Sequence, residues 1–327
     1  MVDAFQPSCV QDVERSGSVG AVEIARDEQW QFWCYLLSPF KHEFDALATR
    51  CHAVVVEVGV EVSNLLACFA VFKDCPSGNS GLRVFIFDVF VIPSDSMLPT
   101  LQPGDKVLVN KTLLGARIYT DFQFDKKGGA LHSFRTNGVR NVRRNDIVVF
   151  NMPYMDGQIK FKINYVYCKR CVALPGDSVS IVDGYYRNNN YDGMLGVEAE
   201  QDCLRQMPDS LIPNYVMNTM PHDSHFSWTI KNLGPLYLPR KNDLMKITPR
   251  EATLYRVLIE WETGKILRID WEHRRVMLNN SRLCKYRFLH DYYFFVGDHV
   301  VNSQDARYWG MVPDDYIVGV VSKIIRK

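Results

Sequence analysis

The sequence lacks a dominant charge of either sign. Its 327 residues carry 38 lysines and arginines against 37 aspartates and glutamates, which gives a formal net charge of +1. Nucleic-acid-binding domains normally gather positive charge on one face, and no basic tract with interleaved aromatic residues occurs here. We therefore expect no nucleic acid as partner. With 47% hydrophobic residues, the chain can bury a sizeable core.

The sequence also lacks the spacings that are typical of metal sites and disulfide frameworks. Its eight histidines show no His-Glu-x-x-His or similar ligand spacing, so we expect no metal and no cofactor. The nine cysteines are an odd number without regular spacing, which does not describe a disulfide framework. Cys168 and Cys171 form a C-x-x-C pair inside an apolar, strand-like run. Because cysteine packs well as a small hydrophobic residue, two apolar strand positions are favoured over a redox or metal pair.

The N-terminal region, 1–50, lacks the pattern of a cleavable signal peptide. Residues 1–20 are polar, without a basic stretch that leads into an apolar run and a small-residue cleavage site. Residues 28–48 repeat aromatic and apolar side chains with near-helical spacing. We predict a helix here, either packed on the protein or lying at a membrane interface, and both interpretations stay open.

The next segment, 51–73, is apolar enough to be considered a membrane anchor. Its apolar run is about as long as a bilayer is thick and is bounded by Arg50 and Lys73. Glu57 and Glu61 oppose insertion, because each acidic residue near a helix centre costs roughly 2.5–3.5 kcal/mol, while a good apolar residue contributes roughly 0.3–0.6 kcal/mol. Their spacing of four places both carboxylates on one helix face. We predict a membrane span, with a strand as the alternative because valine and glutamate alternate.

From residue 84 onward the pattern is one of strands and turns. Gly-Asp or Asn-Asp pairs stand directly before apolar strand starts at four places. These pairs are Gly104-Asp105, Asn145-Asp146, Gly176-Asp177 and Asn242-Asp243. Gly and Asn tolerate positive φ, and Asp closes such a turn with its own side chain. The pairs predict strand-entry turns in an antiparallel sheet system, and residues 250–290 are expected to hold a helix or paired strands.

Two hydroxyls stand two residues apart on a proline-bracketed loop. Ser94 and Ser96 directly follow the strand-like run 84–91. A serine is a weak nucleophile unless a base activates it, and a candidate base, Lys169, lies inside the apolar run 165–174. An apolar surround favours the neutral amine, because desolvation lowers a lysine pKa from its usual value of about 10.4. Taken singly, turn serines and solvated strand lysines are common, but together they suggest a serine/lysine hydrolase.

These residues belong to three blocks in the chain. The blocks are Pro93-Ser94-Asp95-Ser96-Met97 with Pro99-Thr100-Leu101, then Lys169-Arg170 with Ala173-Leu174-Pro175-Gly176-Asp177, and finally Asn302-Ser303-Gln304-Asp305-Ala306-Arg307-Tyr308-Trp309-Gly310. In this order they resemble the type I signal peptidase (leader peptidase) family, especially Bacteroidetes-like members with an extended β insertion. The resemblance covers about residues 84–185 and 228–325 and depends on all three blocks together.

The resemblance implies a mostly β fold of antiparallel sheets or a partly open barrel, beside the N-terminal helical segment. The catalytic core would comprise 84–184 and 249–327, and an inserted β subdomain would occupy 185–248. The implied activity is that of a serine endopeptidase that cuts signal peptides from exported preproteins. It would work without metal or cofactor on the outer, periplasmic face of the cytoplasmic membrane, as a single-pass protein in contact with lipid, and its oligomeric state is left open.

The family also implies roles for individual residues. Ser96 would be the nucleophile and Lys169 its general base. Ser94 would offer its hydroxyl to the developing oxyanion, together with the Ser96 backbone N–H. Ser303 would hydrogen-bond and orient the lysine amine. Arg170, the neighbour of the lysine in the strand, would face the opposite side and stay solvated.

Two further sets of residues follow from the same resemblance. Asp305 and Arg307 would form a charge pair that supports the last loop, with an exposed pair of little energetic worth as the alternative. The substrate pocket would be lined by Phe90, Ile92 and Pro93 and would suit small side chains before the cut, the A-x-A pattern of secretory signals.

Two departures from the family pattern support alternative hypotheses. Asp95 stands between the serines, where a glycine or a small polar residue is common, and an inward carboxylate would favour a charged lysine. The stretch 299–301 reads His-Val-Val, where Asn-Arg-Asp or similar is more usual. These departures motivate a degenerate paralogue that binds signal-like peptides without cutting them. A self-cleaving regulator of the LexA-like type would need a DNA-binding helix-turn-helix, whose pattern residues 1–80 do not show.

Overall fold

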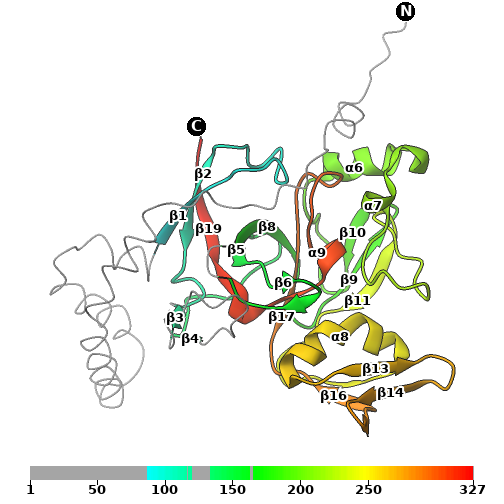
Figure 1. Cartoon of the computed structure of the whole chain (residues 1–327). Coiled ribbons are helices and arrows are strands. Elements are labelled where there is room, and N and C mark those ends of the chain that lie inside the picture. Colours follow the sequence, from blue (N-terminus) through cyan, green and yellow to red (C-terminus); the bar gives the residue numbers. More distant parts are fainter. Residues whose placement is uncertain (1–86, 116, 120–132, 163–164, 327) are drawn as a thin grey trace, which may run out of the picture.

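The computed structural model describes residues 87–115, 117–119, 133–162 and 165–326 (Figure 1). The expected interfacial helix at 28–48 and the expected membrane anchor at 51–73 lie outside these residues. Across the described ranges, no helix is both long and apolar enough to cross a membrane.

A curled antiparallel sheet of seven strands forms the centre of the fold (Figure 1). Its spatial order is β1-β2-β19-β5-β8-β17-β18, and each neighbouring pair is antiparallel. The strands are β1 (Phe87–Val91), β2 (Lys106–Asn110), β5 (Ile147–Asn151), β8 (Val166–Ala173), β17 (Tyr292–Val296), β18 (Val312–Pro313) and β19 (Ile317–Ile325). The prediction of a mostly β, antiparallel fold is confirmed.

Smaller sheets and short helices surround this centre. The remaining strands are β3 (Arg117–Tyr119), β4 (Ser133–Arg135), β6 (Tyr154–Met155), β7 (Gln158–Ile159), β9 (Ser178–Val182), β10 (Tyr185–Asn188), β11 (Leu233–Tyr237), β12 (Leu244–Lys246), β13 (Leu267–Asp270), β14 (Arg275–Leu278), β15 (Ser281–Arg282) and β16 (Lys285–Arg287). The helices are α6 (Glu198–Gln206), α7 (Asn214–Met217), α8 (Pro249–Thr263) and α9 (Ala306–Trp309). In Figure 1, α8 lies across the hairpin β13–β14, and α6 and α7 lie near β9 and β10.

All four predicted strand-entry turns are present, and they share one geometry. The first residue of each pair has a positive φ, between 68° and 95°. Each aspartate carboxylate accepts the backbone N–H of the residue three positions before it, at 2.8–2.9 Å. The strands β2, β5, β9 and β12 then begin directly after the aspartate. Local turn chemistry therefore fixes where these four strands start.

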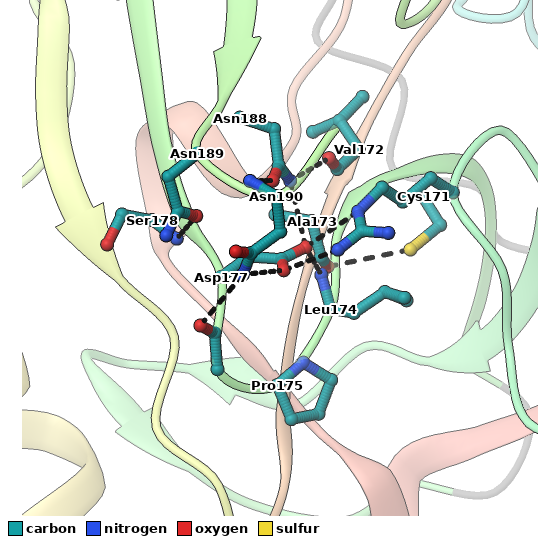
Figure 2. A network of polar contacts seen from close by, with 12 residues as sticks. Cys171, Val172, Ala173, Leu174, Pro175, Asp177, Ser178, Asn188, Asn189 and Asn190 are labelled. Atoms are coloured by element: carbon teal, nitrogen blue, oxygen red, sulfur yellow. Dashed lines mark hydrogen bonds and ion pairs between the residues drawn. The ribbon is translucent and has the colours of Figure 1, made fainter. Parts of the chain in front are cut away.

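Asp177 is the most heavily bonded of these turn aspartates (Figure 2). Its buried carboxylate accepts hydrogen bonds from the Arg144 guanidinium at 2.6 and 2.9 Å, from Asn188 at 2.8 Å and from Asn190 at 3.0 Å. Burial alone would raise the pKa of Asp177, but these bonds and the one from the Leu174 backbone N–H hold it below the ordinary value. The network joins the end of β8 to the start of β9.

The region 250–290 contains both of the expected alternatives, a helix followed by paired strands. The helix, α8, begins with a capping box in which Thr248 and Glu251 bond each other's backbone N–H groups. It ends at Gly264, which takes the left-handed conformation with φ 64°. The hairpin β13–β14 follows directly.

The chain leaves the large sheet after β8 and returns to it only at β17. This excursion begins before and ends after the predicted insertion, 185–248. The predicted insertion is also not purely β, because α6 and α7 lie within it. The two helices contribute to a small separate apolar cluster, made by Leu204, Met207, Ile212, Val216, Ile230, Val300 and Val301. The last two of these residues directly precede the third sequence block, so the excursion contacts the loop that leads into that block.

Candidate active site

The loop that carries the two serines is held in place by backbone hydrogen bonds and by buried apolar side chains. Ile92 N–H donates to the Asp105 carbonyl at 2.8 Å, which closes the loop between β1 and β2. Met97 and Leu101 are almost fully buried and pack with Val149 and Val166 of the large sheet. Leu101 N–H also donates to the Met97 carbonyl at 2.9 Å. Because its apolar side chains point into the core, the loop presents its hydroxyls from a fixed backbone.

The lysine comes from the middle of the large sheet. Lys169 lies in β8, opposite Val148 of β5, and is only 2% exposed. Its Nζ lies 2.5 Å from the Ser96 Oγ, although the two residues are 73 positions apart. Burial lowers the pKa of Lys169, and the negative charge of Asp305 opposes this effect. The fold therefore brings the predicted nucleophile and base into hydrogen-bond contact and favours the neutral amine.

The second hydroxyl lies beside the first. Ser94 Oγ is 3.3 Å from Ser96 Oγ, and both serines are partly buried. The structure thus places the predicted oxyanion donor next to the predicted nucleophile.

Ser303 reaches the site but does not make the bond that we expected. Its side chain is 6% exposed, and among the described residues its Oγ has no hydrogen-bond partner. It lies against Gly297, where an added Cβ would stand 2.1 Å from Ser303 Oγ and 2.5 Å from the Ser96 carbonyl oxygen. Ser303 and the Ser96 carbonyl thus both lie close to Gly297, and the predicted hydrogen bond from Ser303 to the lysine amine is not formed.

The pair Asp305–Arg307 is fully buried, so the alternative of an exposed surface pair is wrong. Both side chains are 0% exposed and meet through two hydrogen bonds, of 2.8 and 2.7 Å. The Asp305 carboxylate also accepts from the Gly297 N–H at 2.8 Å, and it caps the start of α9. One carboxylate therefore joins both ends of the loop that contacts the nucleophile.

The Asp95 carboxylate is bonded to the third sequence block. It accepts a hydrogen bond from Asn302 Nδ2 at 2.9 Å. The largest influence on the Lys169 pKa is burial, followed by the charge of Asp305. The Asp95 carboxylate thus bonds to a neutral amide of the third block, while the Lys169 amine bonds to Ser96.

The expectation that Arg170 stays solvated is wrong. Its side chain is 14% exposed and forms a bidentate ion pair, of 2.5 and 2.6 Å, with the fully buried side chain of Asp298. It also donates to Thr100 Oγ1 at 3.2 Å and to the Asn145 carbonyl at 3.0 Å. Strand alternation predicts the side on which Arg170 lies, but it does not reveal that the loop before the third block covers that side. The ion pair between Arg170 and Asp298, which holds the loop before the third block on β8, is the contact that sequence reasoning missed.

A small cleft runs beside Ser96, with a cavity volume of about 20 Å³. The three predicted pocket residues, Phe90, Ile92 and Pro93, all line it. Strands β5 and β8 also line it, through Val149, Val166, Tyr167 and Cys168. The strand-like pattern of β8 around Lys169 was the signal that could have identified the last three.

The C-x-x-C pair shows no redox or metal geometry. Cys168 and Cys171 are free thiols in β8, and they differ in burial because one lines the cleft and the other lies in the core. Burial raises the pKa of Cys168 to about 12, which keeps the thiol protonated.

In the described ranges, one group could bring three metal ligands together, His290 with Asp314 and Asp315. These side chains already form ion pairs, at 3.5 and 3.4 Å.

A serine hydroxyl in contact with a buried lysine amine, beside a small apolar cleft on a curled β-sheet, defines a candidate hydrolase site. In a comparison with known protein families, the family model for signal peptidase, peptidase S26, matches residues 68–231 and 258–325 of the chain. The chain belongs to this family of peptidases.

Individual relatives agree with the family. The signal peptidase I of Buchnera aphidicola subsp. Acyrthosiphon pisum is 28% identical over 256 residues, which are 74% of this chain and 69% of that protein. The signal peptidase I of Pseudomonas fluorescens is 27% identical over 73% of this chain and 64% of its own length. That of Helicobacter pylori is 26% identical over 72% of this chain and 73% of its own length.

Proposed function

We propose that this chain is a serine/lysine endopeptidase that removes N-terminal signal peptides from exported preproteins after small residues. The observation that carries the proposal is the 2.5 Å contact between Ser96 Oγ and Nζ of the buried Lys169. Burial favours a neutral amine at this place, and a neutral amine is the form that can accept a proton.

The reaction follows from these groups. Ser96 Oγ attacks the scissile carbonyl carbon while its proton passes to Lys169 Nζ. The negative charge that forms on the carbonyl oxygen is held by the Ser94 hydroxyl and the Ser96 backbone N–H. Lys169 then returns the proton to the leaving amine, which releases the mature protein and leaves the signal peptide as an ester on Ser96. A water molecule, deprotonated by Lys169, hydrolyses this ester and restores the serine.

The cleft supports a preference for small side chains. A cavity of about 20 Å³ holds little more than one water-sized group, so an alanine methyl fits where a leucine or phenylalanine side chain does not. Phe90, Ile92 and Val149 give this cleft an apolar wall. Together with the pattern that the family resemblance implies, this supports a signal peptide that ends in A-x-A as the substrate.

The site of action is part of the proposal. We infer a single-pass protein of the cytoplasmic membrane, anchored through 51–73 in contact with lipid, with its catalytic domain on the outer face. The apolar run between Arg50 and Lys73 supports this location in the membrane.

Membership of the Bacteroidetes-like subgroup is proposed on the long excursion between β8 and β17. A binding-only paralogue is less well supported, because Asp95 is bonded to Asn302 and the serine–lysine contact is intact.

Cleavage of a preprotein tests the proposal directly. Incubation of the purified chain with a preprotein whose signal ends in A-x-A should give a single cut after the second alanine, identified by N-terminal sequencing of the product. Replacement of either alanine by phenylalanine should reduce kcat/KM by about 100-fold or more, because a bulky side chain does not fit the cleft. A cut at another site, or equal cleavage of the phenylalanine substrates, would contradict the specificity.

The pH dependence of cleavage should report the buried lysine. Because burial lowers the pKa of Lys169 from its ordinary value of 10.5, kcat/KM should rise with pH through that lowered pKa and reach its plateau below pH 10.5. The measurement is a pH–rate profile for one peptide substrate, with tryptophan fluorescence recorded at each pH to verify that the protein stays folded. An acidic limb centred at or above pH 10.5 would argue against Lys169 as the base.

A further inference from the structure

Three polar contacts join the nucleophile loop, 94–97, to the loop 297–303, and none of them belongs to the dyad. Asn302 Nδ2 donates to the Asp95 carboxylate at 2.9 Å. The His299 backbone N–H donates to the Ser96 carbonyl at 3.2 Å. His299 Nδ1 lies 3.3 Å from the Asp95 carbonyl oxygen, to which it donates when protonated at that nitrogen. Both the side chain and the backbone of Asp95 are therefore used.

The loop 297–303 is itself tied to the fold on three sides. Asp298 pairs with Arg170 of β8. Gly297 N–H donates to the buried carboxylate of Asp305. Val300 and Val301, which are 1% and 9% exposed, pack into the apolar cluster of α6 and α7. The loop is thus a fixed support against which another segment can be positioned.

The residues that depart from the family pattern, at 95 and 299–301, meet at the loop 297–303. A glycine in place of Asp95 would leave the Asn302 amide without this acceptor and would free the backbone between the two serines. The valines at 300 and 301 are the side chains that fasten the support to the excursion. The departures from the family pattern at 95 and at 299–301 are therefore parts of one contact.

We propose that Asp95 is a positioning residue for Ser96. Its carboxylate, held by Asn302, fixes the nucleophile loop on the 297–303 loop and so keeps Ser96 Oγ within reach of Lys169. It acts through geometry, not through its charge on the lysine. This role rests on the proposed peptidase function.

Four variants of the full chain test the role with an A-x-A peptide: Asp95→Ala, Asp95→Asn, Asn302→Ala and the double variant Asp95→Ala/Asn302→Ala. Loss of one hydrogen bond to a charged group is worth roughly tenfold in rate. We expect each alanine variant to lower kcat about tenfold while KM changes less than about twofold. The double variant should be no slower than the slower single variant, because both remove the same contact. Asp95→Asn keeps an acceptor and should stay within about threefold of the wild type.

The pH profile separates positioning from electrostatics. If the carboxylate acted on the lysine by charge, Asp95→Asn would move the acidic limb of kcat/KM to lower pH, since removal of a negative charge lowers a lysine pKa. We expect the limb to stay in place. As a control, Asp192→Asn removes an exposed carboxylate elsewhere and should alter neither kcat nor the limb. A shifted limb in Asp95→Asn, full activity of Asp95→Ala, or additive losses in the double variant would overturn the proposal.

Hydrogen exchange tests the contact between Asp95 and Asn302 without substrate. In the wild type, Leu98 N–H donates to the Asp95 carbonyl and Leu101 N–H to the Met97 carbonyl, both at 2.9 Å. Peptides that cover 94–101 should exchange faster in Asp95→Ala and in Asn302→Ala than in the wild type. Unchanged exchange would show that the contact between Asp95 and Asn302 does not fix this loop. If faster exchange is found but the wild-type chain cuts no preprotein, the contact stands and the proposed peptidase function fails together with the role of Asp95 in it.

Discussion

Replacement of Ser96 by alanine, or of Lys169 by methionine, is expected to reduce kcat for preprotein cleavage by about 10⁴-fold or more. Groups that act as one catalytic unit lose most of the rate when either is removed, and here the two atoms lie 2.5 Å apart. Lys169→Arg should be equally inactive, because a guanidinium stays protonated and cannot serve as a base. The measurement is single-turnover cleavage of an A-x-A preprotein with the enzyme in excess.

The same lysine variants carry their own folding control. Because burial lowers the pKa of Lys169, the unfolded chain binds more protons than the folded chain between that lowered pKa and 10.5, so folded-state stability rises with pH across this window. Lys169→Met removes the buried amine and should be at least as stable as the wild type at neutral pH, without this rise. A variant that is both folded and active would refute the proposed base.

The contact between Ser96 and Lys169 was predictable because the three blocks occur together, since neither residue is distinctive alone. The strand-entry turns were predictable for a local reason: Gly or Asn supplies positive φ, and the following Asp accepts a nearby N–H. Such features depend only on neighbours in the sequence, and the structure reproduces them at all four places.

Features that depend on what covers a residue were not predictable. Strand alternation predicted the side of the sheet on which Arg170 lies but not its ion-pair partner, because Asp298 is 128 positions away in the sequence. The extent of the excursion was not predictable for the same kind of reason, because no local pattern marks where the chain rejoins the large sheet. Val300 and Val301 looked like departures from a motif until α6 and α7 were seen to pack on them.

Asp305→Asn is expected to destabilise the folded chain by about 3–5 kcal/mol, which is the usual cost of leaving a buried charge without its partner. Arg307 is 0% exposed and has only this carboxylate as its ion-pair partner among the described residues. Asp183→Asn serves as the matched control, because it removes a carboxylate from an exposed pair with Arg205. This variant should cost less than about 1 kcal/mol. The measurement is urea unfolding of the full chain, followed by fluorescence.

The double variant Asp305→Asn/Arg307→Met decides whether the cost is that of an unpaired charge. Methionine removes the stranded guanidinium and fills part of its volume, so the double variant should be more stable than Asp305→Asn alone. Cleavage should not recover with stability, because the neutral amide introduced by Asp305→Asn holds the Gly297 N–H less firmly than the carboxylate does, and that loop supports the nucleophile. A double variant that is less stable than Asp305→Asn would mean that the pair stabilises through its hydrogen bonds to the loop and not through charge compensation.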